Sequence, residues 1–523
     1  MPKTTAKSKA AKMPAAAGAR LIPPKDGATV RMYRIGHGDC FLLAFPGETE
    51  DKPVYVLIDC GYKPGSPAYI NTTAKEVAAN ILEATGGHVD VAVISHEHQD
   101  HVNGITASNF KDLRIGETWL AWTEDPNDGL ANSLRTKFKD KLLGLLAARN
   151  RLTAAGDLDQ VQRIDEFLSF ELGGDEGPFN APAAEALLGA SGHPGTSMNK
   201  KSMQLFKDKA KKVTCIRPHK SIITIPGARN LRVFALGPPR DETRLQELDP
   251  QGSEQFHSLA AASAGSYLAA ALVEDRVCSP FAGRFQIPQD QAFADSQHGQ
   301  FFTTYYGQDG TPLSPPIGIA TLSEGEAHAN PDWRRIDKDW LYSAEELALD
   351  MNNETNNTSL VLAFELGKGG KVLLFAADAQ RGNWTSWAKM EWQDGDKTIT
   401  ARDLLGRTVL YKVGHHGSHN ATLNGSLTDE HPNLAWMAQG DHEQEFTAMI
   451  TAVRAWAETQ KGWDHPMKAI KEALLKKASG RVFQTDKDFS NMTMPQDTSK
   501  ADWDAFQSCT RGDRLYFDYT ITK

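Results

Sequence analysis

The sequence lacks long apolar runs. No stretch reaches the roughly 18 apolar residues that a membrane-spanning helix needs, so we expect no membrane span. The first 25 residues are rich in alanine and lysine, and they lack the leucine-rich segment typical of a secretory signal. Together these features predict a cytoplasmic protein.

Cysteine is scarce as well. The five cysteines are an odd number, and no two of them have C-x-x-C spacing. Both a disulfide framework and a thiolate zinc site are therefore disfavoured. This pattern also fits a reducing cytoplasm.

Acidic side chains are missing from the first 25 residues, which hold six lysines and arginines. Residues 1–27 are predicted to form a disordered basic tail, with contact to nucleic acid or a membrane surface as the alternative. The net charge of the whole chain is -9, so the remainder is acidic. An acidic body argues against a large nucleic-acid footprint.

Beyond the tail, apolar strand patterns alternate with a helical pattern, which predicts a layered α/β core. Strands are expected at 29–35, 40–45, 53–58 and 89–94, with a helix at 73–84. A hairpin is expected over 359–376, and a strand at 408–413. Further strands are expected at 434–438, 481–485 and 514–520.

Two long segments interrupt this pattern. Residues 126–212 have helical apolar spacing and are predicted to be a helical insertion. Residues 240–354 are polar and irregular, and we interpret them as an irregular insertion or lid. The core is then assigned to 28–125, 213–239 and 355–523.

Polar residues that can bind a metal follow directly on four predicted strands. They are Asp59, the run His96-Glu97-His98-Gln99-Asp100-His101, Asp378, and the pair His415-His416. Ligand sites of layered α/β proteins collect at strand ends, where a rigid sheet positions loop side chains. A metal needs several nitrogen or oxygen ligands, which must come from more than one such segment.

The histidine-rich run has the pattern H-x-H-x-D-H, which is rarely matched by chance. Its first two histidines can face one ion, while Asp100 and His101 face a neighbouring ion. Asp378 could bridge the two, and His415 could complete the second. The run is not an H-E-x-x-H zinc site, because Asp100 stands where that motif needs histidine.

Four stretches of sequence carry a resemblance to a known family. They are Gly36-His37-Gly38-Asp39-Cys40, Leu57-Ile58-Asp59-Cys60-Gly61, Ser95 to Gly104, and Lys412-Val413-Gly414-His415-His416-Gly417-Ser418, supported by Asn357 to Leu362. The chain resembles the metallo-β-lactamase fold hydrolases. More narrowly, it is similar to the ComEC-type subgroup, which is related to the hydrolase domain of a bacterial DNA-uptake channel.

The resemblance implies an α/β fold, a four-layer αββα metallo-β-lactamase-like sandwich with large insertions. It also implies two divalent ions, zinc or manganese, along one edge. The implied ligands are His96 and His98 for the first ion, Asp100, His101 and His415 for the second, and Asp378 as the bridge. Asp100 would also orient the attacking water, and Asp59 would support the histidine-rich loop.

One feature departs from the wider superfamily, which has another histidine about 20 residues before the bridging acid. Residues 355–359 contain none. The first ion would then rely on two histidines and the bridge, helped by an asparagine oxygen or water. That site is expected to be weak, selective for manganese, or empty.

Five more residues are candidates around the site. His416 is assigned a catalytic role, protonating a leaving group or contacting substrate, with simple packing as the alternative. Substrate binding is assigned to His419, Ser418 and Asn357, although a capping role is favoured for Ser418. Asp39 could border the site or serve only its turn.

The predicted activity is hydrolysis by a metal-activated hydroxide, with a phosphodiester of nucleic acid or a nucleotide as the favoured substrate. The same chemistry would suit a lactone, thioester, amide or peptide bond. A different class also remains open, a non-catalytic metal-binding subunit whose insertions hold a protein partner.

Overall fold

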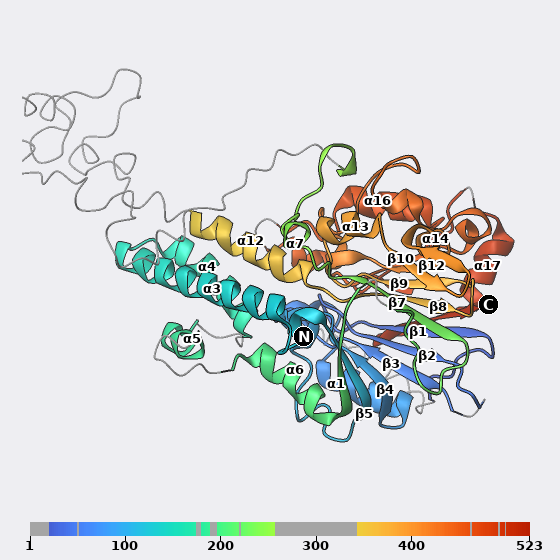
Figure 1. Cartoon of the computed structure of the whole chain (residues 1–523), viewed down its shortest axis with the longest axis horizontal. Helices are drawn as coiled ribbons and strands as arrows, with labels where there is room; N and C mark the ends of the chain where they lie inside the picture. The colour runs from blue at the N-terminus through green and yellow to red at the C-terminus, as the bar shows by residue number, and fades with distance from the viewer. Residues whose placement is uncertain are drawn as a thin grey trace, which may run out of the picture.

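The computed structural model describes residues 20–49, 52–173, 179–188, 196–218, 221–256, 343–460, 463–489, 492–496 and 498–523. Most of the predicted lid, 257–342, and the tail up to residue 19 lie outside the described residues. Two β-sheets dominate the described part, and a group of helices projects from them (Figure 1).

The first sheet has eight strands in the order β15-β16-β1-β2-β3-β4-β5-β6. Strands β3 to β6 are parallel, and the others are antiparallel. The strands are β1 (Gly27–Tyr33), β2 (Phe41–Phe45), β3 (Val54–Ile58), β4 (His88–Val93), β5 (Arg114–Ala121), β6 (Ala210–Ile216), β15 (Thr510–Gly512) and β16 (Tyr516–Thr522).

The second sheet has six strands in the order β14-β13-β12-β9-β8-β7. They are β7 (Leu231–Gly237), β8 (Val361–Leu366), β9 (Val372–Phe375), β12 (Thr408–Lys412), β13 (Thr447–Ile450) and β14 (Val482–Gln484). Strands β8 and β9 form the antiparallel hairpin expected from the sequence. A separate hairpin pairs β10 (Glu391–Asp394) with β11 (Lys397–Thr400).

The two sheets pack face to face through a shared apolar core. Phe41 of β2 meets Phe375 of β9 edge to face at 5.3 Å between ring centroids, and Phe45 stacks on Phe364 of β8 at 5.7 Å. Each fully buried aromatic side chain contributes about 1.5–3 kcal/mol through removal from water. This core holds the two sheets together.

Helices cover the outer face of each sheet, so the chain is an α/β sandwich, as the sequence predicts. α1 (Ala74–Thr85) and α6 (Met198–Lys209) pack on the first sheet, and α13 (Arg381–Trp387), α14 (Ala401–Gly406) and α16 (Lys468–Lys477) pack on the second. Helix α1 begins at a capping box between Thr73 and Glu76. Further helices are α2 (Gln99–Val102), α7 (Glu242–Leu245), α15 (Arg454–Ala457) and α17 (Lys500–Ser508).

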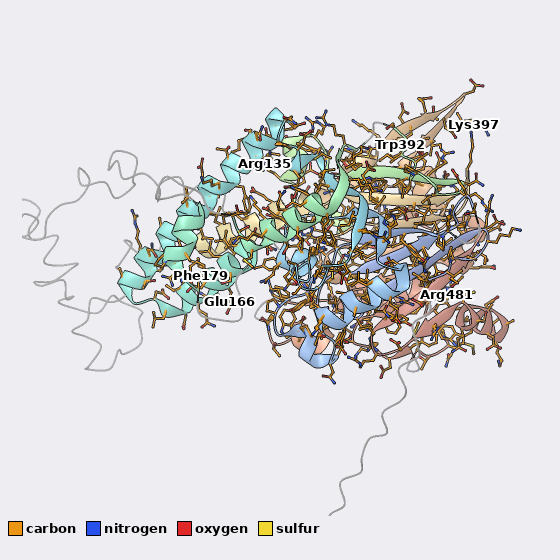
Figure 2. The ribbon with its side chains drawn as sticks, turned by 90° about the horizontal axis from the view of Figure 1, so that it is seen from below. Arg135, Glu166, Phe179, Trp392, Lys397 and Arg481 are labelled. Carbon is orange, nitrogen blue, oxygen red and sulfur yellow. The ribbon has the colours of Figure 1, made fainter. Side chains whose placement is uncertain are left out.

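A helical arm projects from the sandwich (Figures 1 and 2), with Arg135, Glu166 and Phe179 along it. It consists of α3 (Gly129–Ala155), α4 (Leu158–Leu172), α5 (Ala181–Leu188) and α12 (Ser343–Asn357). Leu145 and Leu168 belong to the arm's own small core. Helices α4 and α12 end close to the sheets, so their last residues lie beside the candidate metal centre.

Two features of the fold qualify the expectations from sequence. The prediction of a strand at 434–438 is wrong. Leu434–Trp436 forms a 3-10 turn, and the Asn433 side chain caps this turn by accepting a hydrogen bond from Ala435 N. Its apolar residues pack beneath the outer helices instead of pairing in a sheet. Leu21 is buried, although it falls within the predicted tail. Among the described helices, none has the length and apolar character to cross a bilayer.

Candidate metal centre

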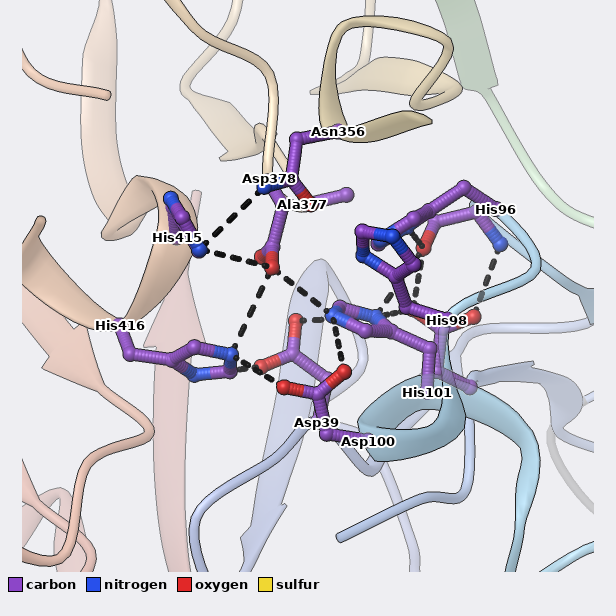
Figure 3. Close-up of polar contacts among 12 residues, drawn as sticks. Asp39, His96, His98, Asp100, His101, Asn356, Ala377, Asp378, His415 and His416 are labelled. Carbon is purple, nitrogen blue, oxygen red and sulfur yellow. Dashed lines mark hydrogen bonds and ion pairs between the residues drawn. The ribbon is translucent and has the colours of Figure 1, made fainter. Parts of the chain in front are cut away.

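The candidate centre lies where four strands of the two sheets end. Asp59 follows β3, His96 follows β4 after Ser95, Asp378 follows β9, and His416 follows β12. Backbone hydrogen bonds hold these loops against one another, as from His415 N to Ala377 O at 3.0 Å. The strand ends therefore meet at one edge of the sandwich (Figure 3).

Two overlapping groups of buried residues could hold a metal ion, a smaller one of Asp39, Asp59 and His101 and a larger one that we call the metal-competent group. The metal-competent group consists of Asp100, His101, Asp378 and His416. Each offers one ligand atom, and these atoms all lie within 4.8 Å of one another. Asp378 Oδ2 is 3.2 Å from His101 Nε2 and 3.5 Å from His416 Nε2, and Figure 3 shows it between the two rings. His416 Nε2 is also 3.2 Å from Asp100 Oδ2.

Three ligand atoms of this group have no hydrogen-bond partner although they are buried. They are Asp100 Oδ1, His101 Nε2 and Asp378 Oδ2. An unsatisfied buried polar group costs about 1–3 kcal/mol, and more when it is charged. A divalent cation would satisfy all three at once, so the residues fit a metal.

Both histidines of the group are anchored through their outer ring nitrogens. His101 Nδ1 lies 2.9 Å from Asp59 Oδ2, and Asp59 Oδ1 accepts a hydrogen bond from Ser95 N at 2.8 Å. His416 Nδ1 lies 3.0 Å from the carbonyl oxygen of Thr451. A proton on each Nδ1 leaves the Nε2 lone pair directed inward, the arrangement typical of metal-ligating histidine.

The buried carboxylates of the metal-competent group favour positive charge next to them. Burial raises the pKa of Asp100, but the hydrogen bond from His416 and the charge of His101 outweigh it and hold that pKa well below its usual value. Burial lowers the pKa of His416, but Asp378 and Asp100 raise it to about 9. Protons on the imidazoles balance the carboxylates, and a divalent cation could replace that charge.

Lys412 and Asp39 extend the network on one side. The Lys412 ammonium contacts the Asp39 carboxylate, donates to Ala377 O at 3.0 Å, and lies 3.4 Å from Asp378 Oδ1. Asp39 Oδ1 accepts a hydrogen bond from the Thr451 hydroxyl at 2.6 Å. Asp39 therefore belongs to the buried network and not only to its turn.

Of the two adjacent histidines at the end of β12, only His416 belongs to the metal-competent group. His416 Nε2 belongs to the metal-competent group, whereas His415 lies outside it, with Nε2 4.0 Å from Asp378 Oδ2 and 3.3 Å from the Asn356 amide. Both residues have positive φ, 41° and 54°. This left-handed turn directs the second ring inward and leaves the first side chain 13% exposed.

The first two histidines of the run are not part of the group. His96 Nε2 is buried without a partner, and its Nδ1 lies 3.3 Å from the Ser359 hydroxyl. His98 Nε2 lies 2.8 Å from Glu171 Oε1. The two rings are adjacent, with centroids 4.7 Å apart, but no third donor joins them in the described part of the chain.

The predicted substrate-binding residues lie apart from the centre or are already engaged. The Asn357 amide donates to Leu245 O at 3.0 Å, and its oxygen accepts from Gln380 N at 3.0 Å, so Asn357 joins loops. Ser418 is buried at the end of the 3-10 turn that carries His415 and His416. His419 is exposed and lies 3.1 Å from Asp249.

Several residues of the site were missed by sequence reasoning. Lys412 could have been found from the sequence, because it is a lysine at the end of a mostly apolar strand. His37 lies in the stretch from Gly36 to Cys40, and the centroid of its buried ring is 4.5 Å from the centroid of the His416 ring. His465, whose buried ring has its centroid 5.4 Å from that of His415, gave no sequence signal, and neither did Glu171. Both come from segments that the motifs do not cover.

No protein-family model matches the sequence, and a search of curated proteins finds no match. The geometry described above therefore carries the functional conclusion. What it supports directly is a mixed α/β chain with a buried histidine and aspartate cluster that could bind a metal.

Proposed function

We propose that the chain is a metal-dependent hydrolase of the metallo-β-lactamase superfamily, acting on phosphodiesters of nucleic acid or nucleotides. The group of Asp100, His101, Asp378 and His416 carries this proposal, because three of its buried ligand atoms lack partners. The two face-to-face sheets, with the site at their strand ends, fit the layered sandwich that the sequence resemblance implies.

The four residues of the group would hold one ion, and His96 and His98 would take part in holding the other. A bound ion would lower the pKa of a water molecule to about 7 and stabilise negative charge on the reacting oxygen. His415 borders this group and is partly exposed, so we assign it the contact with the reacting end of the substrate. Burial lowers the pKa of His415 to about 4, which keeps it neutral at pH 7.

Lys63 supports an anionic substrate. Its ammonium lies 3.0 Å from the centroid of the Phe170 ring and 5.3 Å from that of Trp463, and it has no ion-pair partner among the described residues. Burial lowers its pKa to about 8, although the charges of Asp100 and Glu171 oppose this. The side chain is still mostly charged at pH 7, so it could bind a phosphate oxygen beside the metal group.

The test measures metal content and cleavage on the same samples. Purified protein with manganese or zinc would be given single-stranded DNA, duplex DNA, RNA and a chromogenic phosphodiester. Asp100→Ala should lose both bound metal and cleavage, because it removes a ligand. Asp112→Ala, at an exposed position in the segment before β5, is the matched control and should behave as wild type.

Three other results would change or contradict this proposal. Bound metal without cleavage of any phosphodiester would exclude the nuclease assignment and move the search to lactones, thioesters, amides and peptides. Metal bound without any hydrolysis would favour a non-catalytic subunit. A wild-type protein that binds no metal would contradict the proposal as a whole.

A further inference from the structure

Helix α4 of the helical arm delivers a carboxylate to the histidine-rich loop. Glu171, one residue before the end of α4, places Oε1 2.8 Å from His98 Nε2, although the two residues are 73 positions apart. Both side chains are only 1% exposed. A contact of this length between two buried, ionisable groups is strong and directional.

Neighbouring residues fix Glu171 in place. The Asn199 side chain, from α6, donates to Phe170 O at 2.9 Å and to Glu171 O at 3.1 Å. The Phe170 ring packs on the His98 ring with centroids 4.6 Å apart. The end of α4 is therefore tied both to the sandwich through α6 and to His98 itself.

The contact follows the pattern of the other anchored histidines. His101 has one ring nitrogen on the Asp59 carboxylate, and His416 has one on the Thr451 carbonyl. In His98 the anchored atom is Nε2, so a proton there would leave the Nδ1 lone pair for a metal. Glu171 Oε2 is buried with no partner of its own, a placement that favours positive charge nearby.

We propose that Glu171 is a positioning residue for the first ion, fixing the tautomer and orientation of His98. The inference rests on the proposed metal-dependent function and deepens it. The sequence offers no third histidine for this ion, so its affinity should depend more strongly on the orientation of His98 than it would in a site with three histidines. Because Glu171 belongs to α4, occupancy of the first ion depends on docking of the helical arm.

The test is metal stoichiometry and affinity, measured by elemental analysis and by titration with a chromophoric chelator. Wild type should bind two ions. Glu171→Ala should bind the first ion roughly 10- to 100-fold more weakly while the second stays unchanged. Glu171→Gln keeps an acceptor for His98 and should recover part of the loss. Glu166→Ala, an exposed glutamate of the same helix, is the matched control.

Imidazole nitrogen NMR on metal-free protein separates positioning from general stability. Wild type, Glu166→Ala and Glu171→Gln should show His98 with its proton on Nε2, and Glu171→Ala should lose that preference. The melting temperature of Glu171→Gln, which keeps an acceptor for His98, should stay close to wild type. Unchanged first-ion affinity, a wild type with only one ion, or loss of both ions in Glu171→Ala would overturn the inference. A wild type without metal would overturn the proposed function as well.

Discussion

Replacing Asp59 by asparagine tests how the proposed second ion would be held. Asp59 Oδ1 accepts from Ser95 N at 2.8 Å, and Oδ2 faces both the Ser95 hydroxyl at 2.7 Å and His101 Nδ1 at 2.9 Å. The backbone of Asp59 has a φ of 54°, which asparagine tolerates better than most residues. Asp59→Asn therefore changes the side-chain chemistry with little backbone strain.

The expected effect follows from where the new amide group can point. Its oxygen must face Ser95 N–H, so its NH2 group faces His101 Nδ1. That donor favours a lone pair on Nδ1 and moves the proton to Nε2, where the metal should bind. Loss of such an outer contact lowers metal affinity roughly 10- to 100-fold. This corresponds to about 1.4–2.7 kcal/mol of binding free energy.

The measurement is a competition titration of the second ion against a chelator, for wild type, Asp59→Asn and Ser95→Ala. Ser95→Ala removes one hydroxyl contact but keeps the carboxylate on His101, so its loss of affinity should be smaller. Equal affinity of Asp59→Asn and wild type would refute the assignment of His101 Nε2 as a ligand. A larger loss in Ser95→Ala would refute the tautomer argument.

Three further changes give distinct expectations. Lys412→Met removes the buried cation that contacts Asp39 and lies 3.4 Å from Asp378 Oδ1, and it should cost about 3–5 kcal/mol, seen as a lower melting temperature that added metal partly restores; an unchanged melting temperature would contradict this. Gly61→Ala would place a methyl group 2.4 Å from the His101 backbone and should lower metal content, whereas Gly406→Ala meets only ordinary contacts and should not. His419→Ala, at an exposed position, should leave metal content unchanged.

The layered core could be predicted from sequence because most residues of its strands are apolar. Strand β3 is apolar throughout and is followed directly by Asp59, and the apolar end of β4 at Val93 is followed by Ile94, Ser95 and His96. The prediction failed for residues 434–438, because an apolar segment that is buried beneath helices has the same composition as a buried strand. Pairing in a sheet is decided by neighbouring strands, which composition does not reveal.

The ligand segments were predictable for the same reason, since strand ends converge at one edge of a sheet. The inward direction of the His416 ring was not, because it depends on two successive residues with positive φ. Glu171 could not be found either. It reaches His98 through a helix of a segment predicted as an insertion, so its contact depends on tertiary packing alone.

The most direct test of the proposed metal centre is the divalent metal content of wild type, His416→Ala and His415→Ala, purified and loaded identically. His416→Ala should lose one ion per chain relative to wild type, because its Nε2 belongs to the metal-competent group. His415→Ala should keep the full metal content and lose only activity. Full metal content in His416→Ala, or a loss confined to His415→Ala, would contradict the centre described here.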